Sequence, residues 1–258
     1  MTPHATPRRF RNFAYLASAC CVGFAFVGSG CAATPDASPA PEATDAAKTP
    51  TMPGLEIDLE AGYVDLDATV IGHGCEWLEL VATTSGGREH EALVTVDAKP
   101  SDLHVALLLL GLEAGTPQTG VRGEDGWRIV PPTGPTVDLH FVLPAENGET
   151  EDTVVPVEDW VFDRAAEATL TDTPNGGWMF TGSRFVRDER SPQEPEVYLA
   201  DVNGTAVSLV HFGDETIGRD TAVTESNDGQ NLAPHAPAMP PNGTPVRLRV
   251  SRIDADRP

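Results

Sequence analysis

Cysteine is scarce in this sequence, and the positions of the few cysteines argue against a disulfide framework. The 258-residue chain contains 4 cysteines, of which Cys20, Cys21 and Cys31 lie in or directly after an apolar N-terminal segment. Cys75 is the only cysteine in the rest of the chain and has no disulfide partner there. An iron–sulfur cluster is not expected either, because it needs about four thiolate ligands. The fold must therefore be held by its apolar core, which is feasible for ~200 residues.

Basic residues are also few. The chain has 17 Lys and Arg against 39 Asp and Glu, a net charge of −22. Residues 1–30 hold Arg8, Arg9 and Arg11 and no acid, so the rest has 17 − 3 = 14 basic residues and a net charge of −25. Nucleic acids and anionic membrane surfaces reward clusters of Lys and Arg. We therefore expect no nucleic-acid partner. The acids are dispersed and form no EF-hand loop, so a dedicated cation surface is not indicated either.

Diagnostic catalytic motifs are absent from the sequence. It contains no G-x-S-x-G, no phosphate-binding P-loop and no dinucleotide fingerprint. The His90-Glu91 pair does not complete a zinc-protease motif, because Val94 stands where the second histidine ligand is required. Hydrolase and nucleotide-dependent functions are therefore not favoured. An envelope enzyme of unknown reaction remains the third function considered.

Residues 1–30 have the pattern of a secretory signal peptide. Three arginines precede the apolar run Phe13–Val27, which at 15 residues is shorter than the ~20 residues of a membrane-spanning helix. The segment 27–31 resembles a bacterial lipobox, with Gly28 where leucine is usual. It predicts lipidation of Cys31 and an anchored protein of the periplasm or outer membrane. The alternative is ordinary cleavage after Gly30 or Ala33, which would give a soluble periplasmic protein.

Two further regions follow the leader. Residues 31–53 are rich in Pro, Ala and Thr without apolar periodicity, which predicts a disordered tether. Residues 54–253 are expected to form a single β-rich domain. Alternating apolar and polar residues predict about ten strands in it. The clearest strands are at 55–59, 64–70, 78–82, 90–96, 137–143, 154–161, 178–186 and 246–253.

The turns between strands have their own signals. Asn203-Gly204 separates the apolar segments 197–202 and 205–212, which is a strong type I′ hairpin signal. Residues 113–135 are rich in Gly and Pro and are expected to form a long loop containing a brief strand at Trp127–Val130. Residues 226–244 are expected to form a second polar, Pro-rich loop.

One short helix is expected at residues 102–110. Ser101 is the expected N-cap and Gly111 the terminating glycine. The helix is apolar on every side, so we expect other elements to enclose it. The fold class is therefore predicted as mainly β: a sandwich or barrel-like antiparallel sheet of about ten strands packed on one short buried helix. The alternative class is α+β.

The best candidate for a metal site combines His73, Cys75, His90 and His104. Imidazole and thiolate ligands suit zinc or copper, and the four residues fall within one predicted strand–strand–helix unit. Against this, His90 alternates with Ala92 and Val94, whereas His73 and Cys75 are on the opposite phase of their own strand. The alternative is that the histidines are structural and donate to backbone carbonyls or nearby carboxylates. No cofactor is predicted by any motif, and zinc or copper is the metal this set would fit.

One motif and five segments of the sequence are distinctive: Glu89-His90-Glu91 and residues 99–101, 104–111, 157–160, 181–185 and 198–201. Together they resemble the YdjY-like bacterial exported proteins, especially the lipoprotein-type members found in planctomycetes. The resemblance covers roughly residues 54–252. It implies an exported domain without agreed catalytic residues. Some members carry the label ferredoxin-like, which the cysteine count of this chain contradicts chemically.

These observations favour an exported, lipid-anchored domain of the cell envelope. We expect it to act as a non-catalytic binding or structural module, with an unidentified protein or small ligand of the envelope as its partner. Long Pro- and Gly-rich loops offer a binding surface, whereas no acid, base and nucleophile converge in the sequence. The alternative function is a metal-binding or redox accessory protein that uses the four-residue cluster.

Overall fold

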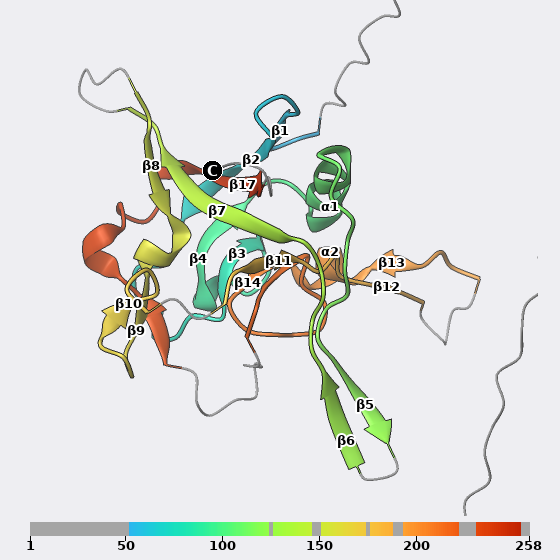
Figure 1. Cartoon of the computed structure of the whole chain (residues 1–258). Helices are drawn as coiled ribbons and strands as arrows, with labels where there is room; N and C mark the ends of the chain where they lie inside the picture. Colours follow the sequence, from blue (N-terminus) through green and yellow to red (C-terminus); the bar gives the residue numbers. More distant parts are fainter. Residues whose placement is uncertain are drawn as a thin grey trace, which may run out of the picture. The chain divides into compact units, whose positions relative to one another are not determined.

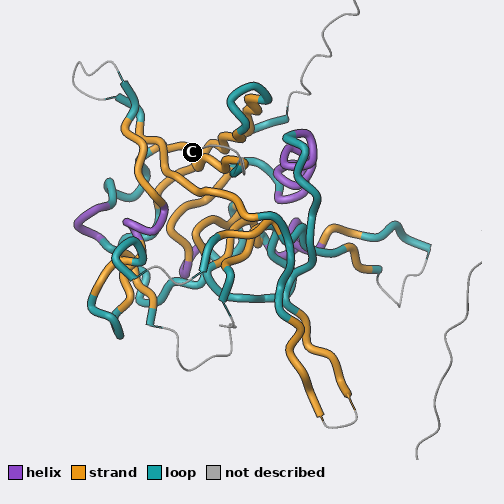
Figure 2. Tube along the Cα trace, viewed as in Figure 1, coloured by secondary structure: helices purple, strands orange, loops and turns teal. Residues whose placement is uncertain are grey.

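A closed β-barrel is the central feature of the computed structural model, which describes residues 52–123, 126–145, 151–173, 176–187, 193–221 and 231–253. The predicted signal peptide, the lipobox and nearly all of the tether lie outside these ranges. The barrel strands follow the order β2-β17-β7-β11-β15-β14-β3-β4, and β4 pairs with β2 to close the ring (Figures 1 and 2). They are β2 (Tyr63–Val70), β3 (Leu80–Thr84), β4 (Ala92–Val96), β7 (Thr136–Leu143), β11 (Trp178–Phe180), β14 (Thr205–Ser208), β15 (Ile217–Arg219) and β17 (Pro245–Arg252).

The barrel is mixed rather than purely antiparallel. Of its eight neighbouring pairs, β14–β15 and β3–β4 are parallel. The predicted mainly β, barrel-like class is confirmed. The parallel pairs show why hairpin reasoning alone is insufficient. β3 and β4 are consecutive strands, yet residues 85–91, which end in the 3-10 helix η1 (Glu89–Glu91), return the chain to the start of β3, so β4 runs parallel to it. His90 lies in η1 and not in the strand predicted for residues 90–96.

The alternation of apolar and polar residues along the strands determines which side chains form the core. On β2, Val64, Leu66 and Val70 are fully buried, as the sequence pattern predicts. The rings of Phe141 on β7 and Trp160 stack with centroids 3.9 Å apart. Trp160 belongs to the 3-10 helix η2 (Val157–Trp160), which interrupts the strand predicted for 154–161 after β8 (Thr153–Pro156).

Smaller sheets surround the barrel. β1 (Leu55–Asp58) forms the predicted hairpin with β2. β9 (Val161–Asp163), β10 (Ala168–Thr169) and β16 (Leu232–Pro234) form a three-stranded sheet, and η3 (Ala236–Ala238) follows β16. Two hairpins project away from the barrel (Figure 1): β5 (Thr119–Gly123) with β6 (Gly126–Val130), and β12 (Phe185–Val186) with β13 (Val197–Tyr198). The brief strand predicted at Trp127–Val130 is confirmed as β6, and the segments predicted as long loops, 113–135 and 226–244, also contain β5 and β16 in their described parts.

The helix α1 (Pro100–Leu109) occurs where the sequence predicts a helix, but the expectation that it is enclosed on every side is wrong. Leu103, Ala106 and Leu107 are fully buried in the barrel core, whereas Leu108 is 45% exposed. Val105 and Leu109, on the same outer side, are also exposed. Within the described ranges, no helix is long and apolar enough to cross a membrane. α1 is thus a half-buried helix with a second apolar face.

Two predicted strand features are corrected. Residues Leu199–Asn203 form the short helix α2, and Gly204 ends it in the left-handed conformation at φ 74°. Asn-Gly suits a helix C-terminus as well as a type I′ turn, because both need positive φ. The strand predicted for 178–186 is also divided: β11 ends at Phe180, and Gly182 and Ser183 turn the chain with φ values of 83° and 52°.

Candidate functional site

The start of α1 is built by a residue 100 positions away in the sequence. The backbone N–H of Ser101 donates to Oδ1 of Asp201 at 2.8 Å, and its hydroxyl donates to Oδ2 at 2.6 Å. The helix begins at Pro100 with Lys99 at the N-cap position, so the prediction of Ser101 as N-cap is wrong. A carboxylate from α2 instead satisfies the first helical N–H, where the helix dipole favours an anion.

A cleft of about 390 Å³ opens beside this cap. It lies where β3 and β4 end and α1 begins, and its volume is within the usual range of small-ligand sites. Val96 and Ala98 give it an apolar component, and hydroxyl, ammonium and carboxylate groups complete the lining. The residues with polar or helix-starting roles are Thr84, Ser85, Asp97, Lys99, Pro100 and Asp201. We call this the α1 cleft.

Two opposite charges in the α1 cleft are available to a ligand. Lys48 and Lys99 are the only lysines of the chain, and Lys99 is exposed at the cleft. Neither its ammonium group nor the carboxylate of Asp97 has a hydrogen-bond or ion-pair partner among the described residues. Asp201, in contrast, is occupied by Ser101. The cleft therefore offers one cation, one carboxylate and the hydroxyls of Thr84 and Ser85.

A polar cluster fixes α1 from its other side. Nδ1 of His104 lies 3.0 Å from the carbonyl oxygen of Gly182 and 2.9 Å from the hydroxyl of Tyr198. Because a carbonyl only accepts, Nδ1 carries the proton in the bond to Gly182, and Nε2 is the unprotonated nitrogen of the neutral ring. Burial lowers the pKa of His104 and outweighs the opposing effect of the Gly182 carbonyl. Burial also raises the pKa of Tyr198, so both side chains are neutral at pH 7.

Ser183 belongs to the same cluster but is not placed as a nucleophile. Its hydroxyl donates to the carbonyl oxygen of Asp214 and accepts the N–H of Ala200 at 3.2 Å. Both roles of the hydroxyl are thus used to hold the turn after β11 against α2. The positive φ of Ser183 is explained by this connection and needs no catalytic role.

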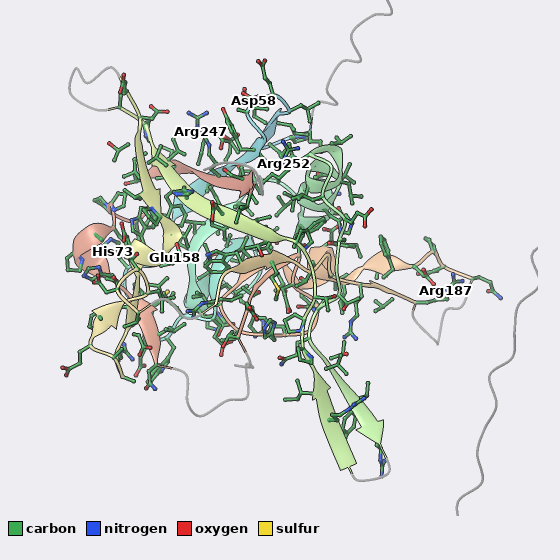
Figure 3. The ribbon with its side chains drawn as sticks, viewed as in Figure 1. Asp58, His73, Glu158, Arg187, Arg247 and Arg252 are labelled. Carbon is green, nitrogen blue, oxygen red and sulfur yellow. The ribbon has the colours of Figure 1, made fainter. Side chains whose placement is uncertain are left out.

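The four residues predicted as metal ligands make different contacts, and the Cys75 thiol lies beside η1, which carries His90. Nε2 of His73 lies 2.8 Å from the carbonyl oxygen of Pro240. Figure 3 labels His73 on the side of the molecule that carries β9 and β10 in Figure 1. His90 is highly exposed, with Nε2 3.6 Å from Glu91. Cys75 is a free, half-buried thiol whose pKa is raised by burial, and His104 lies in the cluster on α1. No group of three or more His, Cys, Asp or Glu suited to a metal ion occurs within the residues that the structure describes.

The metal hypothesis remains a prediction with a direct test. We expect protein purified without a histidine tag to retain no stoichiometric zinc or copper after dialysis, because His73 and His104 are engaged by backbone carbonyls. Elemental analysis by mass spectrometry measures this. Retention of about one equivalent, abolished by both Cys75→Ser and His104→Ala, would instead establish the four-residue site, since loss of one of four ligands removes much of the binding energy.

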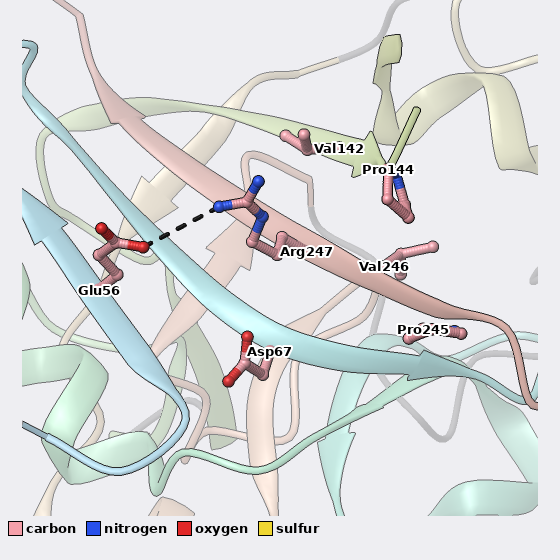
Figure 4. A pocket seen from close by; sticks show the side chains of 7 residues that line it. All are labelled: Glu56, Asp67, Val142, Pro144, Pro245, Val246 and Arg247. Carbon is pink, nitrogen blue, oxygen red and sulfur yellow. Dashed lines mark ion pairs between the residues drawn. The ribbon is translucent and has the colours of Figure 1, made fainter. Parts of the chain in front are cut away.

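A second hollow, of about 310 Å³, lies on the outer surface between β1, β7 and β17 (Figure 4). Arg247 is its central charge, but three carboxylates already surround it: Asp152 at 2.9 Å, Asp65 at 3.5 Å and Glu56 at 3.9 Å. Arg249 forms a bidentate pair with Asp65, with both hydrogen bonds at 2.7 Å. These contacts neutralise Arg247 and Arg249 of β17 with carboxylates of the β1–β2 hairpin and Asp152, so we assign the hollow a structural role.

Sequence reasoning did not identify the residues of the α1 cleft. Lys99, Pro100, Ser101 and Asp201 all belong to segments that carry the family resemblance, as do His104, Gly182 and Tyr198. The family resemblance of these segments was therefore the available sequence signal. Only the fold shows that segments 99–101, 104–111, 181–185 and 198–201 meet around α1.

The fold and the cleft define a class: a mixed eight-stranded barrel with one covering helix whose start, capped from α2, forms a polar cleft. The YdjY domain family matches residues 55–251, and the chain belongs to that family. No curated protein and no solved structure matches the chain.

Proposed function

We propose that this chain is an exported, lipid-anchored domain of the cell envelope that acts as a non-catalytic binding module. The observation that carries the proposal is the α1 cleft, where the charges of Lys99 and Asp97 have no partner within the described part of the chain. Support for binding over catalysis comes from the polar groups on both sides of α1. The hydroxyl of Ser183 and the carboxylate of Asp201 are each engaged by two hydrogen bonds, so they serve the fold and not a reaction.

The ligand that fits the α1 cleft is small, polar and zwitterionic. An anionic group would pair with Lys99, and a cationic or donor group would pair with Asp97, while Thr84 and Ser85 supply hydroxyls. The formal charge of the cleft is +1 from Lys99 and −2 from Asp97 and Asp201, a sum of −1. This balance disfavours ligands that are only anionic, such as phosphate.

The first test is ligand-dependent thermal stability of the processed protein. We expect zwitterions such as glycine or glycerophosphocholine to raise Tm by about 5–10 °C at about 100 times their Kd, because only the folded state binds them. Lys99→Ala should remove the shift, and Arg122→Ala on the projecting β5–β6 hairpin should retain it. A shift produced by phosphate or citrate alone, or one that survives Lys99→Ala, would contradict the assignment of the cleft.

The second test concerns the anchor. Replacing Cys31 with Ser should move the protein from the membrane fraction to the soluble fraction of expressing cells, because the thiol that accepts the lipid is lost. Immunoblots of fractionated cells, with Cys75→Ser as the matched cysteine control, measure the distribution. If wild type and Cys31→Ser partition alike, the lipoprotein assignment fails while the binding role of the cleft still stands.

A further inference from the structure

One side of the domain carries an exposed aliphatic surface that the cleft does not use. It comprises the outer residues of α1, one residue of the turn after β1, and the residue after β17. Their exposed fractions are 44% for Val105, 45% for Leu108, 43% for Leu109, 48% for Leu59 and 44% for Ile253. We call these five residues the α1 face.

Arg252 ties the three parts of the α1 face together. Its backbone N–H donates to the carbonyl oxygen of Gly62 at 2.9 Å, in the turn that follows Leu59. Its guanidinium donates to the carbonyl oxygen of Leu110 at 2.9 Å, at the end of α1. Figure 3 shows Arg252 on the side of the molecule that carries α1 and β1. The three segments that carry the five aliphatic side chains are therefore held together around the end of β17.

The chain also enters the domain on this side. Met52, the first described residue, bridges to Leu55 at the start of β1, and β1 packs against α1. Residues 32–51 connect Met52 to Cys31. A tether of that length spans about 25 Å as a random coil and about 60 Å as extended polyproline II. A lipid on Cys31 would thus hold the α1 face within reach of the bilayer, at an effective concentration of about millimolar.

We propose that the α1 face docks on the surface of a zwitterionic lipid bilayer; this rests on the proposed lipid anchor at Cys31. All five residues are aliphatic, whereas binding surfaces for proteins are enriched in aromatic residues and arginine. α1, with 10 residues, lies along the surface with its outer side among the lipid chains. Asp58 precedes Leu59 in the sequence, and Asp102 and Glu113 flank the outer residues of α1; these acids oppose anionic lipids.

Fluorescent labelling tests the docking. In the Cys75→Ser background, an environment-sensitive fluorophore is attached to the processed protein at Leu109→Cys or, as the matched control, at Ile129→Cys on β6. Ile129 is similarly exposed, at 56%, but lies on the projecting hairpin. The lipidated protein is reconstituted into phosphatidylcholine vesicles with brominated acyl chains. We expect strong quenching at position 109 and none at 129, and we expect Leu108→Glu to reduce the quenched fraction at least about tenfold.

Each other outcome overturns the proposal in a recognisable way. If the protein floats with the vesicles but position 109 is not quenched, the anchor stands and the docking fails. Equal quenching at 109 and 129 would show that no particular face meets the lipid. Failure to float removes both the anchor and the docking. A dimer in lipid-free sedimentation that Leu108→Glu dissociates would assign the α1 face to a second copy of the chain. Stronger quenching with added phosphatidylglycerol would refute the choice of zwitterionic lipid.

Discussion

Replacing Leu107 with Ala is expected to lower the free energy of unfolding by about 2–5 kcal/mol. Leu107 is 0% exposed and lies in the barrel core with the other inward residues of α1. The substitution removes buried methyl groups and leaves a cavity that the closed barrel can only partly fill, so both the transfer and the cavity contributions apply. Urea denaturation of wild type and variant, analysed at constant m-value, measures the difference.

Leu108→Ala is the matched control for this prediction. Leu108 follows Leu107 directly but is 45% exposed on the outer side of the helix. The same chemical change should therefore cost less than about 1 kcal/mol, because little buried volume is lost. Equal losses in the two variants would show that α1 does not have the two different sides described here.

The position of this helix was predictable, but its surroundings were not. Leu103, Leu107 and Leu110 recur at helical spacing, and Gly111 supplies the stop, so local residues suffice to define it. The sequence does not show what covers the outer side of α1. Val105 and Leu109 are aliphatic, like the residues on the buried side of the helix. A sequence pattern cannot distinguish an aliphatic residue that packs in the core from one that contacts a partner.

The strand predictions show a similar division. Alternation located β1, β2, β7 and β17, because each has one face in the core and one in solvent. It failed at Asn203-Gly204, where one dipeptide suits two structures. The parallel pairing of β3 and β4 could not be predicted from alternation either, because it depends on the path of the chain through η1.

The α1 cleft could not be assembled from sequence for a physical reason. At the start of α1, beside the cleft, the backbone N–H of Ser101 donates a hydrogen bond to Asp201, and these two residues are 100 positions apart in the sequence. Local capping rules instead favoured Ser101, the nearest residue of the right type. The proposed metal set had the opposite weakness: its residue types were suitable, but the sequence pattern did not resolve the turns, such as the one that places His90 in η1, that position those residues.

A buried, hydrogen-bonded histidine–glutamate pair, which the sequence pattern does not reveal, leads to the second large effect. Nδ1 of His211 and Oε1 of Glu215 are 2.6 Å apart, and both side chains are almost fully buried. Oε2 of Glu215 accepts the backbone N–H groups of Phe212, Gly213 and Asp214. Nε2 of His211 lies 2.8 Å from the carbonyl oxygen of Thr221. The pair thus organises the turn between β14 and β15. Gly218 packs closely beside it, since a Cβ there would lie 3.1 Å from the Glu215 side chain.

Glu215→Ala is therefore expected to lower the free energy of unfolding by about 3–5 kcal/mol, more than His211→Leu, for which about 1–3 kcal/mol is expected. The asymmetry follows from the number of partners. Removing the carboxylate leaves three backbone N–H groups and the imidazole without their acceptor, whereas removing the imidazole leaves the carboxylate with its three N–H donors. Urea melts of both variants measure the difference, with the exposed Glu113→Ala as a control expected within ~0.5 kcal/mol of wild type. If His211→Leu proves the more costly variant, the turn is held mainly by the imidazole, and the role assigned to Glu215 is wrong.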